Sequence, residues 1–277
     1  MTARQLLSWG RQRLQSQPAG PLEAEILVCH VLGVSRAWLY ANPERVLDPA
    51  RLEAGRDLIE RRVNGEPVAY LTGEREFWSM PLKVSPDVLI PRPETELLVE
   101  IVLKAIPPSA DWRIADLGTG SGAIALALAL ERPGCEVHAT EYSHAALALA
   151  RDNGRRIAPG RVRFHKGSWL APLTGKFEVL VSNPPYVASN DPHLQQGDCR
   201  FEPADALTPG RDALAAIRHI ADESRLYLQQ GGLLAFEHGY DQGEALRQLM
   251  AELGYINVQT HQDLENRERV TTGTFGE

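Results

Sequence analysis

The sequence predicts an α/β fold, in which a mostly parallel sheet follows a small all-helical domain. Beyond Trp112, short apolar stretches alternate with longer helical stretches, as in a parallel sheet that helices cover on both faces. Before residue 74, apolar residues recur every three or four positions, which is the spacing of helices. We therefore expect two domains, and 277 residues are enough for both.

The first part, residues 1–73, is expected to form a bundle of short helices. Its apolar residues fall into three groups at helical spacing: Leu6, Leu7, Gly10 and Leu14; Ile26, Cys29 and Leu32; and Leu52, Gly55, Leu58, Ile59 and Val63. Pro21 and Pro49 suit the first position of a helix, and Asp48 suits the position before it.

A β-hairpin linker is expected at residues 74–90, because two short apolar stretches flank Pro81. Pro93 then suits the first position of another helix, where Glu94 and Glu96 complement the positive end of the helix dipole. The α/β domain is expected to cover residues 91–277.

Seven strands are expected in the α/β domain, at residues 113–117, 136–140, 161–165, 177–181, 232–237, 256–262 and 269–275. Helices are expected at residues 121–131, 143–156, 211–228 and 242–253. Only residues 263–268 separate the last two strands, and that connection is too short for a parallel crossover. The last strand should therefore run antiparallel.

Composition describes an ordinary globular chain, with 43% hydrophobic and 23% charged residues. Cys29, Cys135 and Cys199 are far apart and form no CxxC pair, which argues against disulfides and favours a reducing, cytoplasmic compartment. No apolar stretch approaches the roughly 20 residues that span a bilayer, and the N-terminus lacks the apolar core of a signal peptide. The eight histidines are scattered, so no metal site is expected.

Charge is unevenly spread along the chain, whose formal net charge is -7. Residues 1–85 hold 11 Lys and Arg against 10 Asp and Glu, whereas the remaining residues hold 18 against 26. Binding to a nucleic-acid backbone depends on clustered positive charge. We therefore expect a protein or small-molecule partner and no direct nucleic-acid binding.

A glycine-rich stretch, DLGTGSG at residues 116–122, separates the first expected strand of the sheet from its helix. Glycines at such a place let a ligand approach the backbone and the helix N-terminus. Gly118, Gly120 and Ala123 match the dinucleotide pattern GxGxxA, with Glu141 about 20 residues further on, where it would contact a ribose. The stretch is therefore a candidate cofactor loop.

The same stretch resembles the loop of class I S-adenosylmethionine-dependent methyltransferases, in which an acidic and an apolar residue precede GxGxG. This resemblance implies their Rossmann-like fold, a seven-stranded, mostly parallel sheet with an antiparallel last strand. It also implies that Glu141 accepts hydrogen bonds from the ribose hydroxyls and that Trp169 packs near the adenine, unless it only covers the sheet edge. Related enzymes often carry Asp before that aromatic residue, where this chain has Ser168. The implied cofactor-binding residues are Asp116, Gly118, Thr119, Gly120, Ser121, Gly122, Glu141, Ser168, Trp169 and Asn183.

Asn183, Pro184, Pro185 and Tyr186 follow the fourth expected strand, which lies beside the first in a doubly wound sheet. They resemble the (N/D/S)PP(Y/F/W) motif of methyltransferases that modify planar nitrogens, either of bases or of glutamine. An amide nitrogen is a poor nucleophile because its lone pair is delocalised into the carbonyl group. The Asn183 oxygen and the Pro184 carbonyl could orient it, the prolines would fix that carbonyl, and Tyr186 would offer a flat face. Asn183, Pro184 and Tyr186 are the candidate catalytic residues.

Longer stretches narrow the resemblance. The segments LTGEREFWSMPLKVSPDVLIPRPETELLVE, DPHLQQGDCRFEPADAL and NPPYV are similar to the bacterial release factor glutamine methyltransferase family (PrmC/HemK), over nearly the whole chain. This implies methyl transfer from S-adenosylmethionine, leaving S-adenosylhomocysteine, to N5 of the glutamine in the Gly-Gly-Gln motif of class 1 peptide chain release factors, which tunes translation termination. It implies that residues 1–73 help to bind the release factor and that residues 183–186 contact its glutamine. The expected enzyme is a cytoplasmic monomer without a metal ion.

Other functions fit parts of the sequence. A DNA or RNA adenine-N6 methyltransferase shares the Asn-Pro-Pro-Tyr motif, but it should carry a basic recognition domain. An NAD-dependent oxidoreductase would leave that motif without a role. A non-catalytic adaptor that binds release factors would need neither the motif nor an intact glycine loop. Arg92 and Glu94 are candidates to line a substrate channel, the stretch Phe201-Glu202-Pro203 is a candidate to close over the cofactor, and His238 is a candidate near the edge of the site. Each has a structural explanation at least as good.

Overall fold

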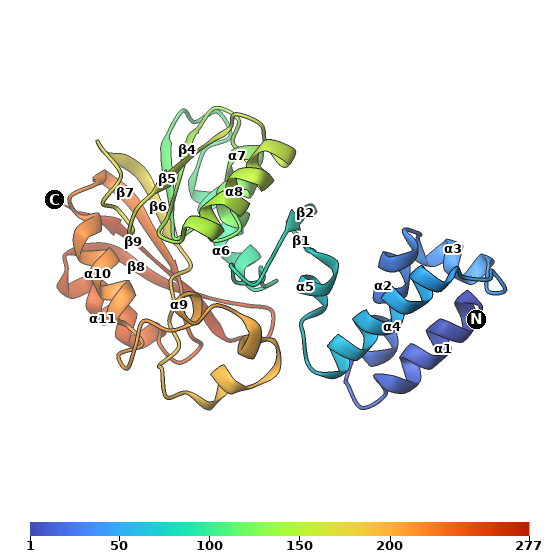
Figure 1. The fold of residues 1–277 in the computed structure, drawn as a ribbon. Helices are drawn as coiled ribbons and strands as arrows, with labels where there is room; N and C mark the ends of the chain where they lie inside the picture. Colours follow the sequence, from blue (N-terminus) through green and yellow to red (C-terminus); the bar gives the residue numbers. More distant parts are fainter. Residues whose placement is uncertain (277) are drawn as a thin grey trace. The chain divides into compact units, whose positions relative to one another are not determined.

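A computed structural model describes residues 1–276 of the chain. Its residues cluster into two compact units, one of Met1–Glu74 and one that begins at Arg75. Each unit has its own hydrophobic core, and each is described by itself below (Figure 1). Residue 277, the last of the expected α/β domain, lies outside the described residues.

The first unit is all-helical, as the apolar spacing predicts. Its helices are α1 (Ala3–Arg13), α2 (Gly20–Leu32), α3 (Arg36–Ala41), α4 (Pro49–Val63) and α5 (Val68–Thr72). Thr2 begins α1 with a capping box, and the Asp48 carboxylate accepts a hydrogen bond from the Arg51 amide at the start of α4. The expected face of α2 is wrong at Ile26, which is exposed, because Ala24, Leu27 and Val28 occupy the core instead.

A fully partnered carboxylate lies inside this first unit. Glu25 is buried, and it accepts hydrogen bonds from Arg11, Arg36 and Tyr40. Burial alone would raise its pKa, but the bonds from Tyr40, Arg11 and Arg36 outweigh burial and lower the pKa to about 2. This cluster joins α2 to α1 and α3 and leaves neither carboxylate oxygen without a donor.

The expected hairpin forms at the start of the second unit. Strands β1 (Glu74–Phe77) and β2 (Met80–Lys83) are joined by Trp78 and Ser79, both with positive φ. The Trp78 amide donates to Glu96 at 2.8 Å and its indole nitrogen donates to Glu131 at 2.9 Å. These contacts, with the buried Phe77, attach the hairpin to α6 (Thr95–Ala105) and α7 (Ala123–Glu131).

The second unit is built on a seven-stranded sheet in the order β5-β4-β3-β6-β7-β9-β8. Its strands are β3 (Arg113–Leu117), β4 (Glu136–Glu141), β5 (Val162–Lys166), β6 (Phe177–Ser182), β7 (Leu228–Glu237), β8 (Tyr255–Gln262) and β9 (Glu268–Phe275). Strands β3 to β7 pair in parallel, and β9 pairs antiparallel with both β7 and β8. The α/β class, the position of the fourth strand beside the first and the antiparallel last strand are therefore confirmed.

Helices cover both faces of this sheet, so alternate residues of one strand enter different cores (Figure 1). One face packs on α6, α7 and α8 (His144–Ile157), the other on α10 (Ala215–Ser224) and α11 (Gly243–Glu252). In β3, Ile114 belongs to the first core, whereas Ala115 and Leu117 belong to the second. Burial on both faces explains the nearly continuous apolar runs of the central strands.

The largest differences from the expected boundaries lie at α10 and at the start of β7. The helix expected at residues 211–228 ends at Ser224, and Leu228 instead begins β7, where it pairs with Phe177. The register between these strands shifts after that pair, and Gly231 has a φ of 75°, so β7 begins irregularly. The segment before α10 holds the short helices η1 (Pro192–Gln195), η2 (Gly197–Phe201) and α9 (Ala204–Leu207). No helix within residues 1–276 is both long and apolar enough to cross a membrane.

Candidate active site

The carboxyl ends of the central parallel strands bring the candidate residues to one edge of the sheet. Asp116 of β3 lies opposite Ala139 of β4 on one side and opposite Val181 of β6 on the other. The glycine loop (residues 116–122) therefore emerges between Glu141, at the end of β4, and the Asn-Pro-Pro-Tyr segment (residues 183–186), which follows β6. At this edge, the Ser182 hydroxyl donates to the Leu117 carbonyl oxygen at 2.6 Å.

Three glycines of the loop have positive φ, for three different reasons. A Cβ atom on Gly118 would lie 2.7 Å from the Trp169 ring, which packs directly on its backbone. A Cβ on Gly122, the residue before α7, would meet Leu126 at 3.3 Å. A Cβ on Gly120, whose φ is 56°, would meet no atom within 4 Å. The backbone at Gly120 is thus the open part of the loop, where a ligand can approach.

Glu141 fixes the loop from the neighbouring strand. Its two carboxylate oxygens accept hydrogen bonds from the Gly120 amide at 3.0 Å and from the Ser143 amide at 2.7 Å. The amides of Gly118 and Thr119 donate to the carbonyl oxygen of Thr140 at 3.0 and 2.9 Å. Because each carboxylate oxygen has a second lone pair, Glu141 keeps acceptor capacity for hydroxyl groups of a ligand.

Asp116 is buried beneath the loop with one oxygen unsatisfied. Its Oδ2 accepts hydrogen bonds from the Thr119 hydroxyl at 2.6 Å and from the Ala125 amide at 3.2 Å. Its Oδ1 has no partner among the residues described. Burial raises the pKa of Asp116 to about 7, and the nearby Glu141 charge adds to that rise. An unsatisfied buried acceptor is uncommon and is typical of a functional site.

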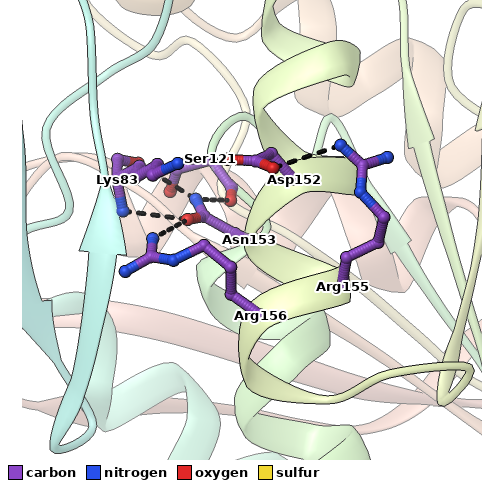
Figure 2. Close-up of polar contacts among 6 residues, drawn as sticks. All are labelled: Lys83, Ser121, Asp152, Asn153, Arg155 and Arg156. Carbon is purple, nitrogen blue, oxygen red and sulfur yellow. Dashed lines mark hydrogen bonds and ion pairs between the residues drawn. The ribbon is translucent and has the colours of Figure 1, made fainter.

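A buried asparagine on α8 ties the loop to the hairpin. Figure 2 shows Asn153 between the backbone of Lys83 and that of Ser121. Its Nδ2 donates to the carbonyl oxygens of Ser121 at 2.9 Å and Lys83 at 3.0 Å, and its Oδ1 accepts from the Lys83 amide at 2.9 Å. Asp152, on the surface beside it, pairs with the Lys83 ammonium group. Asn153 was not among the candidates from the sequence, because its partners lie 70 and 32 residues away.

The two remaining cofactor candidates lie after β5. Trp169 has a φ of 44° and packs on Gly118, so the ring and the loop are brought together. Ser168 is exposed, and its side chain makes no hydrogen bond within residues 1–276. Tyr142, which the sequence reasoning missed, follows Glu141 with 75% of its surface exposed.

The Asn-Pro-Pro-Tyr segment presents two unused acceptors. The Asn183 side-chain nitrogen donates to the Thr95 hydroxyl oxygen at 3.2 Å, at the start of α6. Among the residues described, no donor reaches the Asn183 side-chain oxygen or the carbonyl oxygen of Pro184. Pro184 is buried and its ring fixes the local backbone, so its carbonyl keeps one direction. A planar NH2 group of a ligand could donate one hydrogen to each acceptor.

Tyr186 is held at both of its polar ends. Its hydroxyl donates to Glu237 Oε1 at 3.2 Å, and its carbonyl oxygen accepts from Gln242 Nε2 at 2.9 Å. Burial, and then the Glu237 charge, raise the pKa of the Tyr186 hydroxyl, so it stays protonated. His238, next to Glu237, is buried and bonded to the Thr271 hydroxyl at 2.8 Å, which favours its structural interpretation.

A second long-range contact holds the loop that follows residues 183–186. The buried Glu202 carboxylate pairs with Arg92 and accepts from the Ile90 amide at 3.0 Å. Arg92 and Glu202, both singled out in the sequence, are thus partners of each other. Burial raises the pKa of Glu202, and the Arg92 charge opposes that rise.

Two family models match the chain. The PrmC N-terminal domain matches residues 5–73, and the methyltransferase small domain matches residues 93–211. The release factor glutamine methyltransferase of Vibrio cholerae is 49% identical, over 92% of this chain and 89% of its own length. The protein of the same name from Escherichia coli K12 is 47% identical, over 95% of each chain.

Solved structures share the fold of the second unit. A methyltransferase from Pyrococcus furiosus aligns with a TM-score of 0.56 and 20% identity, over 72% of this chain and 90% of that one. The 16S rRNA N2 G1207 methyltransferase of T. thermophilus, in complex with AdoMet and guanosine, aligns with a TM-score of 0.54 and 18% identity, over 73% of this chain and 49% of that one. These two likenesses concern the fold alone. With nearly half of its residues identical to the curated relatives over nine tenths of its length, the chain belongs to the release factor glutamine methyltransferase family.

Proposed function

We propose that this protein transfers the methyl group of S-adenosylmethionine to the side-chain amide nitrogen, N5, of the glutamine in the Gly-Gly-Gln motif of class 1 release factors. The relatives' names support the substrate. The observation that carries the proposal is the pair of unused acceptors, the Asn183 oxygen and the Pro184 carbonyl, at the edge where the glycine loop opens. That pair matches the two hydrogens of a carboxamide NH2 group.

The residues around the glycine loop suit S-adenosylmethionine. Gly120 leaves room for a ligand at its backbone, and Glu141 keeps acceptor capacity that suits the two hydroxyls of a ribose. The unsatisfied Asp116 Oδ1 suits a cationic or N–H donor such as an amino group. We assign the cofactor to Asp116, Gly118, Thr119, Gly120, Ser121, Gly122, Glu141, Ser168, Trp169 and Asn183, with Tyr142 as an added candidate for stacking on the adenine. When bound, this cofactor supplies an electrophilic methyl group on sulfur.

The Asn-Pro-Pro-Tyr segment would orient the nucleophile. Asn183 and Pro184 each accept one hydrogen bond from the amide NH2 group. The two hydrogen bonds lie in the plane of the amide, so one face of the glutamine nitrogen points toward the methyl group. Tyr186, fixed by Glu237 and Gln242, packs against the planar amide. In this transfer, the glutamine nitrogen would gain the N–C bond, the leaving sulfur would keep the electron pair of the S–C bond, and the nitrogen would release one proton to water. Orientation carries most of the rate enhancement, since no strong base is required once the nitrogen has four bonds.

The remaining parts of the molecule have simpler proposed roles. Residues 1–73 would bind the release factor, since the PrmC N-terminal domain model covers that unit. The hairpin at residues 74–90 would link it to the catalytic domain, which begins at residue 91. We expect a monomer that works in the cytoplasm on a protein substrate, with no direct binding to nucleic acid.

Transfer of labelled methyl from S-adenosylmethionine tests the substrate. A purified, unmethylated class 1 release factor should accept label, and the same factor with Gln→Ala in its Gly-Gly-Gln motif should not. Duplex DNA and structured RNA serve as the other arms, because the acceptor pair also suits the exocyclic amine of adenine. Label on nucleic acid, or equal label on the Gln→Ala factor, would refute the release-factor glutamine as the substrate.

A further inference from the structure

A glutamine joins the Asn-Pro-Pro-Tyr segment to the turn that follows β7. Gln242 lies immediately before α11. Its Nε2 donates to the Tyr186 carbonyl oxygen at 2.9 Å, and its Oε1 accepts from the Gly239 amide at 2.8 Å. Both ends of this one side chain are therefore used, and each of them contacts the main chain of a different segment.

The two partners of Gln242 determine the orientation of its side-chain amide. A backbone N–H group can only donate and a carbonyl oxygen can only accept. The end that faces Gly239 must therefore be the oxygen, and the end that faces Tyr186 must be the NH2 group. A carboxylate of the same length could meet only the first requirement, because both of its oxygens accept. The site thus requires a carboxamide at this position.

A buried histidine fixes the turn that Gln242 contacts. His238 is 0% exposed, and its ring nitrogens Nδ1 and Nε2 each lie 2.8 Å from a partner, the Gly239 carbonyl oxygen and the Thr271 hydroxyl. Since the carbonyl oxygen can only accept, Nδ1 carries the hydrogen. Burial lowers the pKa of His238 and favours the neutral ring, whose Nε2 then accepts from Thr271. The turn is therefore attached to the sheet at β9, to which Thr271 belongs.

The peptide group between Tyr186 and Val187 is held on both sides. Its carbonyl oxygen accepts from Gln242, and its N–H group donates to the Leu207 carbonyl oxygen at 3.0 Å. Because a peptide group is planar, these two contacts together fix the orientation of the whole unit.

This fixed peptide group lies close along the chain to one of the two proposed acceptors, the Pro184 carbonyl. Only Pro185 and Tyr186 separate the two groups, and the ring of Pro185 removes one of the intervening rotations. A displacement of the Tyr186 carbonyl would therefore also displace the Pro184 carbonyl, which has to meet an amide hydrogen of the substrate.

We propose that Gln242 is a positioning residue for methyl transfer, which holds the Tyr186 carbonyl and thereby keeps the Pro184 carbonyl directed at the substrate amide. This role rests on the proposed amide methylation. Gln242 itself does not touch the reacting atoms. It connects the segment that does to a turn that His238 attaches to the sheet.

Steady-state kinetics on the release factor test the proposal with Gln242→Glu and Gln242→Ala. Glutamate keeps the length of the side chain but places an acceptor against the Tyr186 carbonyl, so kcat should fall about 10- to 100-fold. Alanine removes the contact without adding repulsion, and the fall should be smaller, about 3- to 10-fold. In both variants, KM for the release factor and the Kd for S-adenosylmethionine should stay within about twofold, because the cofactor loop is unchanged.

Gln248→Glu is the matched control on the same helix. Gln248 is exposed, and its Nε2 donates to Glu252 Oε1 at 2.8 Å, so this change also places an acceptor against an oxygen. It should keep kcat. An unchanged kcat in Gln242→Glu, a greater loss in Gln242→Ala than in Gln242→Glu, or a loss that appears mainly in KM or in the Kd for S-adenosylmethionine would each overturn the positioning role.

Hydrogen exchange provides a measurement that does not depend on activity. In Gln242→Glu, the carboxylate can still accept from the Gly239 amide, but it no longer holds Tyr186. Exchange of the Val187 amide, followed by NMR, should therefore become about tenfold faster, whereas that of Gly239 should stay within about threefold. An unchanged exchange rate at Val187 would overturn the proposal whatever the substrate. Faster exchange at Val187, together with a wild-type enzyme that fails on the release factor, would instead count against the proposed function alone.

Discussion

The glycine loop and the Asn-Pro-Pro-Tyr segment end neighbouring parallel strands, β3 and β6, yet they are held in opposite ways. The loop lacks side chains at three positions and is fixed mainly by nearby groups, the Thr140 carbonyl and the Glu141 carboxylate of the next strand. The segment is stiffened by two prolines and fixed by side chains from distant elements. Thr95 is 88 residues from Asn183, and Glu237 is 51 residues from Tyr186.

This difference matches what each region would hold in the proposed reaction. A cofactor that returns in every catalytic cycle can be recognised by an open backbone and one carboxylate, which a local turn supplies. A glutamine on a separate protein must be held with its nitrogen in line with the methyl group, and that orientation tolerates little movement. We therefore expect changes in the segment to affect the rate, and changes in the loop to affect cofactor affinity.

The largest effect is expected for Asn183→Ala. Loss of one oriented acceptor should lower kcat about 100- to 1000-fold. Because Asn183 is only one of several residues assigned to the cofactor, the Kd for S-adenosylmethionine should rise by no more than about threefold. Single-turnover methyl transfer and calorimetry measure the two quantities. Asn190→Ala, an exposed asparagine in the loop that follows, is the control and should change neither. If Asn183→Ala lost cofactor affinity as severely as rate, the two regions would not be separate in function.

Asn153→Ala removes one of the side-chain supports of the glycine loop, the hydrogen bond from α8 to the Ser121 carbonyl oxygen (Figure 2). It leaves the Lys83 amide and the Lys83 and Ser121 carbonyls without their partner, so the free energy of unfolding should fall by about 2–3 kcal/mol. Asp152→Ala, which breaks only partly exposed ion pairs on the same helix, should cost less than about 1 kcal/mol. Urea denaturation compares them, and equal losses would contradict the role of Asn153.

Gly120→Ala and Gly160→Ala separate strain from ligand binding. Both glycines have positive φ, 56° and 75°, and in both a Cβ would meet no atom within 4 Å. Each change should therefore cost about 1 kcal/mol of stability from backbone strain. Only Gly120 lies in the glycine loop, so only its change should raise the Kd for S-adenosylmethionine, by about tenfold, or about 1.4 kcal/mol. A similar rise for Gly160→Ala would show that strain alone weakens binding.

The same contrast explains what could be predicted from the sequence. Strand positions followed from apolar runs, and parallel pairing followed from the alternation of strands with helices. Gly118, Gly120, Gly122 and Glu141 followed from their spacing, because a glycine turn after one strand and an acidic residue at the end of the next are a known pattern. The Asn-Pro-Pro-Tyr segment was found from its residue types. The residues that support this segment were not found, since Thr95 was not among the candidates and Glu237 was expected only as the end of a strand.

The two errors in the fold expected from the sequence have the same origin. Ile26 has helical spacing with Cys29, yet the packing of α2 on α1 and α4 buries Ala24, Leu27 and Val28 instead. The end of α10 was misplaced because residues 225–228 continue an apolar spacing typical of a helix, while pairing with Phe177 makes Leu228 part of β7. Contacts between residues far apart in the sequence determine both positions, and the local sequence pattern does not predict such contacts.

The smallest effect is expected from pH, through two buried carboxylates of opposite character. Asp116 has a folded pKa of about 7, above the value of about 3.9 in an unfolded chain, so its contribution to stability is complete below pH ~4 and is lost as the pH rises through 7. Glu25, with a folded pKa of about 2, contributes above pH ~4.3 and loses that contribution only as the pH falls toward 2. Between about pH 6.5 and 8, in the absence of cofactor, wild type should lose about 1 kcal/mol relative to Asp116→Asn and nothing relative to Glu25→Gln. Urea denaturation at both pH values measures these differences. A constant difference from Asp116→Asn would mean that Asp116 is already ionised at about pH 6.5, and that the glycine loop gives its second oxygen a partner.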